Sequence, residues 1–419
     1  MSDEAPTDLF AAIGVLDEPP PRRRGFSRVL LVMVRVLVTL VSIAVVAGSA
    51  VVYAQVDRLQ DSVNTTEALA QAQAAPDAPD PGDGANDILL VGSDTRTDLQ
   101  GRPLPERLLK ELRTEATDGT LNTDTLILLR FPDGGGKGYA VSIPRDTYVQ
   151  VPNWREEKIN GAFGVTKAKT AERLVAAGEK DRTKIERESD AAGRSALVQS
   201  VQGLTGVRID HYAEITLYGF YLLTEVIDGV DVCLNHATSD PDSGANFRRG
   251  PQTVRGADAV SFVRQRNGLP RSDLDRIVRQ QTFLSSAMNK VLSGGMLTDN
   301  AKLGELADAV SKTVIMDPGL HFLDLVNQAQ ALASGQVQFV TIPVTGVGAR
   351  NDRGQSIITV DLAAVKSFIA ALATSAAPPP PAPVSTPAPV TVSAPATPGL
   401  LGPRPLSLNG GRKAVPCID

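Results

Sequence analysis

The sequence predicts a layered α/β domain that follows one transmembrane helix. Three observations predict it. Apolar runs of strand length alternate with segments of helical periodicity after residue 86, an uncharged run precedes them near the N-terminus, and polar or proline-rich stretches flank both. Strands interleaved with helices are typical of layered α/β domains. A chain of 419 residues is long enough for such a domain together with an anchor and two tails.

The predicted anchor is the uncharged run Val36–Tyr53, which at roughly 18 residues is near the lower length limit for a membrane-spanning helix. Five arginines precede it, namely Arg22, Arg23, Arg24, Arg28 and Arg35. By the positive-inside rule, the N-terminus is then cytoplasmic and the rest of the chain lies outside. The alternative is a cleaved signal peptide, although this run is longer than the usual apolar core and its small residues lie inside it. We expect a disordered cytoplasmic tail (1–28), a single-pass plasma-membrane helix (29–53) and a stalk (54–85).

The extracytoplasmic domain is expected over residues 86–374. Short apolar or alternating runs predict strands at 87–92, 125–131, 138–143, 209–218, 230–234 and 336–342. Helical spacing or helix-favouring composition predicts helices at 166–203 (one or two, on the surface), 273–293, 302–315, 319–334 and 361–373. The end of the chain is rich in Pro, Ala, Thr and Val, so residues 375–419 are expected to be a disordered tail.

The chain has two cysteines, Cys233 and Cys417, and both lie in the part predicted to be exported. In an oxidising compartment, a disulfide that ties the tail to the domain is one interpretation. Two free thiols are the other. We favour the disulfide, because a polar tail has little else to hold its last residues in place.

The stretch Phe262–Gln281 concentrates positive charge in a chain whose formal net charge is −5. It holds five arginines: Arg264, Arg266, Arg271, Arg276 and Arg279. A guanidinium group binds phosphate oxygens with a planar, permanently charged fork, and a helix N-terminus also attracts anions. Ser272 and Asp273 are positioned to cap the helix that begins within this stretch. The segment therefore predicts a phosphate-bearing ligand.

Helical spacing sorts the members of this segment. Arg276 and Gln280 share a polar face that is expected to point into the site, and Arg279 lies at the margin of that face. The opposite, apolar face is expected to hold the helix in the fold, through Leu274, Ile277, Val278, Leu284, Met288, Val291 and Leu292. Arg271 lies in a loop. We expect Arg271 and Arg279 to matter less than Arg264, Arg266 and Arg276.

Two acidic residues stand at the ends of adjacent predicted strands: Asp94 follows the first, and Asp124 precedes the second. Carboxylates are the hard ligands that Mg²⁺ uses together with water and substrate phosphate. Taken singly, each is more commonly a turn cap. Arg145 follows the third strand, where a lone arginine is commonly a surface ion pair. Together with the arginine segment, however, these residues predict a metal-assisted phosphoryl-transfer site. Nucleic-acid binding is disfavoured by the acidic chain and its external location.

Six segments, taken in order, resemble the LytR–CpsA–Psr family. They are Asp87–Arg96, Asn122–Leu126, Val141–Thr147, Lys158–Ala162, Gly206–Tyr212 and the arginine segment. The resemblance implies an α-β-α sandwich with a mixed central sheet, helices on both faces and an apolar cleft for a lipid. It also implies a phosphotransferase dependent on Mg²⁺ (or Mn²⁺). Such members move a glycopolymer from a polyprenyl-diphosphate carrier to peptidoglycan at the membrane.

The resemblance also assigns roles to residues of this chain. Asp94 and Asp124 would hold the metal, and Asp273 would be a supporting acid. The diphosphate oxygens would be bound by Arg145, Arg264, Arg266, Arg276 and Gln280. Many members have an arginine where this chain has Asn122, so one phosphate contact is either missing or supplied by another group such as Arg96.

Two alternatives to the phosphotransferase would use the same phosphate-binding residues. One is a non-enzymatic envelope sensor that binds polyprenyl phosphates, and the other is a diphosphatase in which water replaces the acceptor hydroxyl. A transcriptional role is disfavoured by the predicted external location. Arabinogalactan, a teichoic acid and a capsular polymer all present the same diphosphate, so the pattern does not select among these glycans.

Overall fold

The computed structural model describes residues 63–95, 104–112, 122–271, 273–293, 300–321, 337–373 and 415–419, together with a few single positions elsewhere. The chain divides into two units, Met1–Asp57 and Arg58–Asp419, and the elements below belong to the second. The predicted cytoplasmic tail and transmembrane helix lie outside the described ranges, apart from five single helical positions. Within the part of the chain that is described, no helix has both the length and the apolar character needed to cross a membrane.

A mixed seven-stranded sheet is the centre of the described residues. In spatial order its strands are β1 (Asn64–Thr65), β12 (Val314–Met316), β7 (His211–Thr216), β2 (Ala85–Ser93), β3 (Thr123–Pro132), β4 (Gly138–Ser142) and β13 (Val337–Thr341). Three neighbouring pairs are parallel, namely β1 with β12, β7 with β2, and β4 with β13. The other three pairs are antiparallel. This is the mixed sheet that the family resemblance implies.

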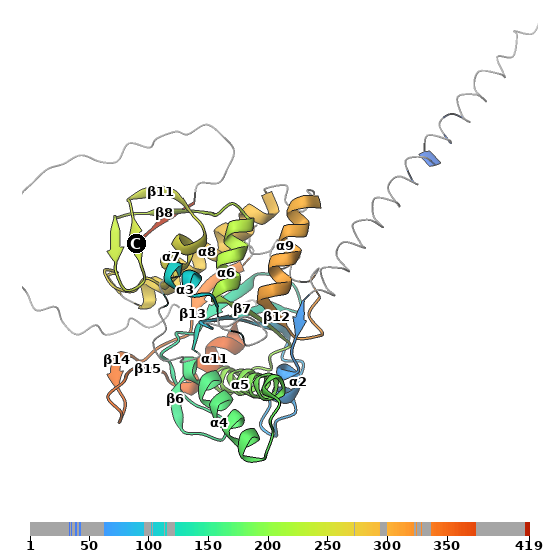
Figure 1. Ribbon diagram of the computed structural model, residues 1–419, viewed down its shortest axis with the longest axis vertical. Helices are drawn as coiled ribbons and strands as arrows, with labels where there is room; N and C mark the ends of the chain where they lie inside the picture. Colours follow the sequence, from blue (N-terminus) through green and yellow to red (C-terminus); the bar gives the residue numbers. More distant parts are fainter. Residues whose placement is uncertain are drawn as a thin grey trace, which may run out of the picture. The chain divides into compact units, whose positions relative to one another are not determined.

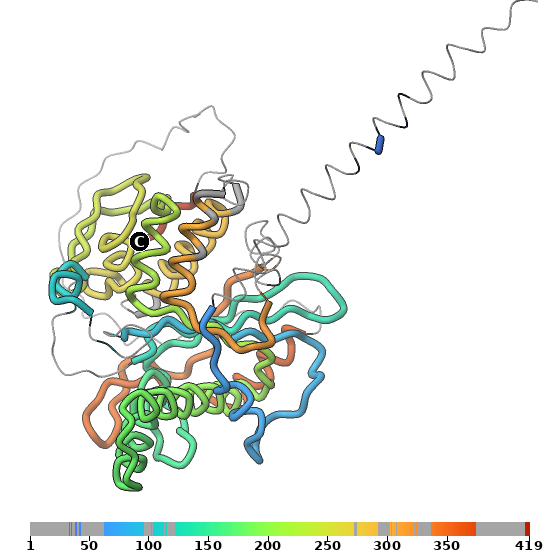
Figure 2. Tube along the Cα trace, turned by 45° about the vertical axis from the view of Figure 1, so that its right-hand side comes forward, coloured from blue at the N-terminus to red at the C-terminus, as the bar shows by residue number. Residues whose placement is uncertain are grey.

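Alternating side chains of the central strands are divided between two hydrophobic cores. Leu89 and Leu128 belong to the first core, and their neighbours Ile88 and Ile127 to the second. The first core is covered by α2 (Ala68–Gln73), α4 (Ala162–Ala176), α5 (Arg182–Thr205) and α11 (Leu362–Ala371). The second is covered by α6 (Leu217–Val226), α7 (Gly256–Arg264), α8 (Asp273–Ser293) and α9 (Asn300–Thr313). The sheet lies between these two groups of helices (Figures 1 and 2), as the predicted layered fold requires.

Helix α5 illustrates how local sequence sets an element. Asp181 caps its N-terminus by accepting hydrogen bonds from the main-chain N–H groups of Thr183 (2.9 Å) and Lys184 (3.2 Å). Gly206 ends the helix in the left-handed conformation with φ of 77°. Its second half is buried against the sheet, with Leu197 fully inaccessible. The prediction of surface helices over 166–203 is therefore wrong for this half, because its apolar residues complete the first core.

Short strands and helices surround the central layers. They are α3 (Glu106–Glu111), the hairpin β5 (Tyr148–Gln150) with β6 (Glu156–Lys158), the 3₁₀ helix η1 (Ile159–Gly161), the pair β9 (Thr238–Asp240) with β10 (Ala245–Phe247), and the pair β14 (Gly346–Arg350) with β15 (Ser356–Thr359). A further three-stranded sheet has the order β11 (Gly250–Val254), β8 (Val230–Leu234) and β16 (Cys417–Ile418).

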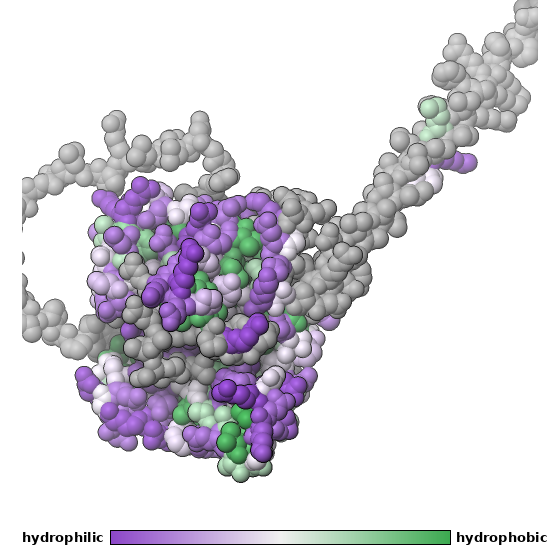
Figure 3. All heavy atoms as spheres, in the orientation of Figure 1, coloured by the Kyte–Doolittle hydropathy of each residue, from purple (hydrophilic) through white to green (hydrophobic). Residues whose placement is uncertain are grey.

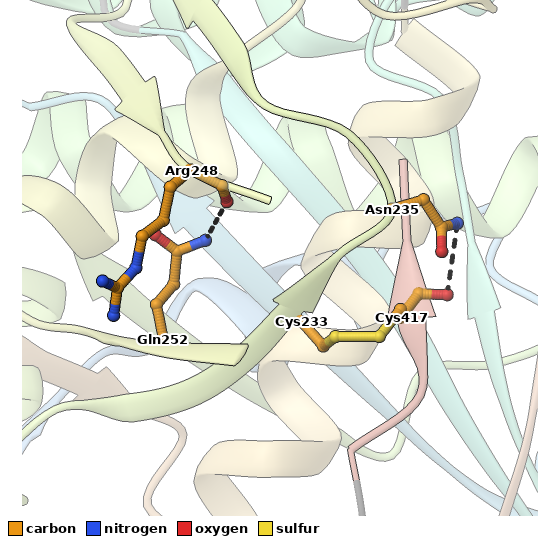
Figure 4. Close-up of a disulfide and its surroundings, with 5 residues drawn as sticks. All are labelled: Cys233, Asn235, Arg248, Gln252 and Cys417. Atoms are coloured by element: carbon orange, nitrogen blue, oxygen red, sulfur yellow. Dashed lines mark hydrogen bonds between the residues drawn. A yellow bond between two sulfur atoms is a disulfide. The ribbon is translucent and has the colours of Figure 1, made fainter. Parts of the chain in front are cut away.

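The expected cysteine pair is joined, since a disulfide links Cys233 in β8 to Cys417 in β16 (Figure 4). The two strands are parallel, and the side-chain amide of Asn235 donates a hydrogen bond to the main-chain oxygen of Cys417 at 3.5 Å. Residues 415–419 are therefore ordered, which corrects the prediction of a disordered tail over all of 375–419. Strand pairing and the disulfide hold residues 415–419 in place, although their composition alone favours disorder.

The prediction of a stalk over residues 54–85 is wrong for residues 63–85. Residues 63–85 belong to the domain, because β1 pairs with β12 and α2 packs against the first core through Leu69 and Ala72. Both side chains are buried. Alanine-rich sequence is common in linkers, but here small side chains allow a short helix to pack closely. The domain thus begins before residue 86.

Candidate active site

A cavity of about 420 Å³ lies on the second face of the sheet, among α6, α8 and α9. Most of its lining is apolar, and the apolar residues include Leu90, Ile127, Ala213, Phe220, Leu223, Phe283, Leu306 and Val310. Its polar residues include Asp94, Asp124, Arg264, Arg276 and Gln280. Hydrophobic atoms also reach the surface over α6 (Figure 3). The cavity is therefore a long apolar space with a cluster of charges along part of its wall.

Three walls of the cavity, formed by α8, β2 and β3, change from polar to apolar in the same direction. Along α8 the lining residues form one stripe at helical spacing, from Arg276 and Gln280 through Phe283, Leu284 and Ala287 to Met288 and Val291. Strand β2 contributes Leu90 and Gly92 before Asp94, and β3 contributes Ile127 on the side of Asp124. The predicted division of α8 is therefore incorrect in part: Leu284, Met288 and Val291 line the site as well, because the cavity runs along the helix.

Asp124 reaches the cavity through an irregularity in strand pairing. Gly92 pairs with Thr125, but Ser93 pairs with Thr123, so Asp124 is the extra residue of a β-bulge. A bulge leaves one residue out of the ladder and redirects its side chain. At Gly92, a Cβ atom would lie only 3.0 Å from the Cβ of Thr125, so this close approach of the strands favours glycine.

The two carboxylates lie beside arginines from three different elements. Asp124 Oδ1 accepts a hydrogen bond from Arg145 Nη1 at 2.7 Å, and Asp94 Oδ2 lies 3.8 Å from Arg264 Nη2. Burial alone would raise the pKa of Asp124, but Arg145, Arg276 and Arg264 together hold that pKa below its ordinary value. The carboxylate is therefore ionised at neutral pH.

Main-chain and amide contacts fix the elements that carry these groups. The N–H of Asp94 donates to the main-chain oxygen of Asn122 at 2.9 Å, which ties the ends of β2 and β3 together. Gln280 donates to the main-chain oxygen of Val263 at 3.2 Å, and Gln281 to the Ser142 hydroxyl at 2.9 Å. Helix α8 is thus bound both to the end of α7 and to the end of β4.

The structure brings together Asp94, Asp124, Arg145, Arg264, Arg276 and Gln280, all of them site residues predicted from the sequence. Arg266 is exposed and does not line the cavity. Arg271 is also exposed and forms an ion pair with Asp275, whose Oδ1 lies 2.6 Å from its Nη2. Arg96 and the side chain of Asp273 lie outside the described part of the chain.

A buried polar network under the site was not predicted. Glu214 of β7 accepts hydrogen bonds from Arg194 Nε (2.6 Å), the Tyr212 hydroxyl (2.8 Å) and the Ser93 hydroxyl (2.7 Å). Burial would raise the pKa of Glu214, but Arg194 and these hydrogen bonds hold it below its usual range. The network fixes Ser93, the residue before Asp94. A glutamate within an otherwise apolar strand pattern was the available signal, since a buried carboxylate requires a partner.

The pair Asp94 and Asp124 fits a divalent cation such as Mg²⁺. Both are carboxylates at one cavity wall, and the lowered pKa of Asp124 provides the ionised form that a hard metal requires. Among the described residues, no group of three or more His, Cys, Asp or Glu side chains is arranged to hold a metal. The remaining ligands of such an ion would be water and substrate oxygens, as is usual for Mg²⁺.

Comparison with known proteins identifies the family. Residues 52–373 match the model of the LytR-CpsA-Psr family. The chain belongs to the LytR–CpsA–Psr family. This agrees with the resemblance carried by the sequence motifs.

Among LytR–CpsA–Psr relatives, the chain is 44% identical over 346 residues to a protein of Corynebacterium glutamicum named cell wall biosynthesis protein LcpA. The match covers 83% of this chain and 66% of that protein. A second relative, from Oceanobacillus iheyensis, is named polyisoprenyl-teichoic acid–peptidoglycan teichoic acid transferase TagU. It is 31% identical over 225 residues, which are 52% of this chain and 62% of that protein. The chain thus spans just under two thirds of the length of these relatives.

Solved structures with a similar fold include TagV of B. subtilis, at 20% identity and a TM-score of 0.47, with 70% of this chain and 98% of that chain covered. Another is a LytR-Csp2A-Psr enzyme from Actinomyces oris, at 14% identity and a TM-score of 0.48, with 71% and 93% covered.

Proposed function

We propose that this protein transfers a glycopolymer from a polyprenyl-diphosphate carrier to peptidoglycan during cell wall assembly, with the help of Mg²⁺. The observation that carries the proposal is the polarity gradient of the cavity. Its walls run from two carboxylates and two arginines to an apolar channel. A polyprenyl diphosphate has the same gradient, from an anionic head to a hydrocarbon chain. The names of its relatives, which include a teichoic acid transferase, support the same class of reaction.

The proposed reaction is a displacement at phosphorus. An acceptor hydroxyl of peptidoglycan forms a bond to the phosphorus that carries the glycan, and the bond from this phosphorus to the bridging oxygen breaks. Polyprenyl phosphate leaves with that oxygen, and the hydroxyl proton is released. Negative charge that develops on the phosphate oxygens is stabilised mainly by preorganised positive groups.

The side chains of this protein divide that work. Arg264 and Arg276 bind the diphosphate oxygens from the ends of α7 and α8, and Arg145 does so from the end of β4. Asp94 and Asp124 would hold the cation, which would supply charge neutralisation to the phosphates when bound. The apolar stripe of α8 binds the lipid chain and keeps water away from the head group. We assign the protein to the outer face of the plasma membrane, because the lipid carrier and the peptidoglycan acceptor meet there.

The test is transfer of a labelled lipid-linked glycan to peptidoglycan in the presence of Mg²⁺. Wild type should release polyprenyl phosphate and label the acceptor. Asp124→Ala and Arg145→Ala should each lower kcat by at least about 100-fold, the usual scale for losing one electrostatic stabiliser of a transition state. Removal of Mg²⁺ with a chelator should cause a comparable loss.

The outcomes also separate the two rivals. Tight lipid binding by wild type without turnover on a competent acceptor would establish the sensor and exclude the enzyme. Monophosphate release at the same rate with and without acceptor would establish a diphosphatase. Only acceptor-dependent release supports the transferase.

A further inference from the structure

Arg279 is buried, as Arg276 is, but unlike Arg276 it does not line the cavity. Only 1% of it is exposed, although it carries a full charge within the first half of α8. Its guanidinium group lies 5.0 Å above the ring of Phe262, in α7. Burial lowers the pKa of Arg279 to about 10, which leaves it charged at neutral pH. A buried cation that does not line the cavity requires a structural explanation.

Arg279 connects two segments that are far apart in sequence. Its Nη1 donates to Gln265 Oε1 at 2.7 Å, and its Nε donates to the main-chain oxygen of Asp419 at 2.9 Å. Gln265 is the residue after Arg264, and its main-chain N–H bonds to Ser261 at 3.0 Å. The contact with Gln265 therefore joins the end of α7 to α8.

The other partner of Arg279 belongs to the segment Cys417–Asp419, which is held in place independently of α8. Cys417 is joined to Cys233 by the disulfide, and Ile418 packs against the second core. The Asp419 carboxylate lies 2.8 Å from His236 Nδ1. These contacts bind the segment to β8 and to the residues after it, so Asp419 offers Arg279 a fixed acceptor.

The loop after α7 is fixed from its other side as well. Gln265 donates to the main-chain oxygen of Asn267 at 2.9 Å and to the Thr238 hydroxyl. The buried carboxylate of Asp240 accepts from the N–H groups of Arg266 and Asn267, both at 3.3 Å. The bond to Arg279 is thus one part of a network that sets where α7 ends and where Arg264 lies.

We propose that Arg279 is a positioning residue that holds Arg264 and Arg276 at the spacing a diphosphate requires, and that the disulfide-linked segment Cys417–Asp419 supplies half of its anchorage. The inference rests on the proposed diphosphate site. Arg276 is one turn before Arg279 on α8, and Arg264 directly precedes Gln265. The side chain of Arg279 therefore fixes the positions of both Arg264 and Arg276. Mutual repulsion of the site arginines tends to separate these helices, and the bridge opposes that separation. Sequence alone placed Arg279 at the margin of the site and gave it a lesser role.

The test compares Arg279→Gln, Arg279→Lys and Cys417→Ser with wild type, and uses Arg271→Gln as a control. The control removes the same charge from the same segment, but at an exposed position outside the cavity. Two probes are titrated calorimetrically in the presence of Mg²⁺: geranylgeranyl diphosphate, and geranylgeraniol, which has the chain without the phosphates. Transfer of a lipid-linked glycan gives kcat and KM.

For Arg279→Gln we expect Kd for the diphosphate to rise about tenfold and kcat to fall about tenfold, since small displacements of binding groups weaken both. Affinity for geranylgeraniol should stay within about twofold of wild type, because the apolar wall is unchanged. Arg279→Lys should lose most of the same affinity, since one ammonium does not reproduce the planar double contact. Cys417→Ser should lose about threefold, because the bond to Gln265 remains.

Three results would overturn the proposal. They are wild-type behaviour of Arg279→Gln, full rescue by lysine (which would leave charge as the only role), and equal losses for the alcohol and the diphosphate (which would indicate general loosening of the fold). The proposed function is tested separately by wild-type transfer. If wild type shows no turnover but its diphosphate affinity depends on Arg279, the function fails and the positioning role stands.

Discussion

Two clusters of carboxylates and arginines lie at opposite ends of β2 and β3. At the cavity, Asp94 and Asp124 lie beside Arg145, Arg264 and Arg276. At the other end, Asp83, Asp87 and Asp210 lie around Arg130, which contacts both Asp83 (3.1 Å) and Asp87. Three arginines act on the carboxylate of Asp124 in the first cluster, whereas Arg130 is shared by the carboxylates of Asp83 and Asp87 in the second.

This difference shifts the pKa values of the carboxylates in the two clusters in opposite directions. In the second cluster, burial raises the pKa of Asp87 to about 8, with the carboxylates of Asp83 and Asp210 adding to the effect and Arg130 opposing it. In the first, the arginines lower the pKa of Asp124. The first cluster lies at a cavity that an anion can enter. In the second, Arg130 and Asp87 are buried, so the same residue types there stabilise the fold.

The largest expected effect comes from a matched pair, Arg130→Gln and Arg145→Gln. Loss of Arg130 removes the cation that Asp83 and Asp87 share. Above pH 8, where Asp87 is ionised, this loss should cost about 3–5 kcal/mol in the free energy of unfolding. Loss of Arg145 should change that free energy by about 1 kcal/mol or less, because its ion pair is partly exposed and repulsion among the site arginines is relieved. Urea denaturation measures both. Equal costs for the two variants would contradict the distinction between the clusters.

The second prediction concerns pH. The folded-state pKa of Asp87, about 8, lies above its ordinary value of 3.8, so the folded protein binds the extra proton between these values. Its contribution to stability is complete below the unfolded pKa and is lost as the pH rises towards 8. The free energy of unfolding should therefore fall by up to about 1.4 kcal/mol per pH unit between pH 6 and 8. Asp87→Asn should flatten this slope, and an unchanged slope in that variant would refute the assignment.

The smallest effect is stabilisation by an added anion. Pyrophosphate at ten times its Kd should raise the free energy of unfolding by about 1.4 kcal/mol, because only the folded protein offers the first cluster. Arg276→Gln should abolish this stabilisation, whereas Asp87→Asn should retain it. Thermal unfolding with and without pyrophosphate provides the measurement. Loss of the effect in Asp87→Asn would mean that the second cluster also takes part in anion binding.

Local sequence signals were sufficient to predict the central strands and helix α8. Strands β2, β3 and β4, and helix α8, follow from apolar runs, periodicity and turn residues within a few positions of one another. The site residues Asp94, Asp124 and Arg145 followed because each stands at a strand end. Such ends are set by local signals.

Contacts between distant segments were not predictable in this way. Nothing near Leu69 indicates that its helix packs on a sheet rather than forming a stalk, since its partners lie in α5 and the sheet. The bulge at Asp124 depends on the register between β2 and β3. Arg279 looked marginal because its two acceptors, Gln265 and Asp419, are 14 and 140 residues away in sequence.

The disulfide also determines what a protease can release from this protein. Cys233 and Cys417 are separated by 184 residues, and the link closes the intervening chain into a covalent loop. A protease that cuts once between residues 374 and 414 would open the loop without releasing its last residues. Asp419 would remain beside Arg279, and the cut protein would separate into two pieces only after reduction. A cut in this stretch would therefore leave the contact between Asp419 and Arg279 in place.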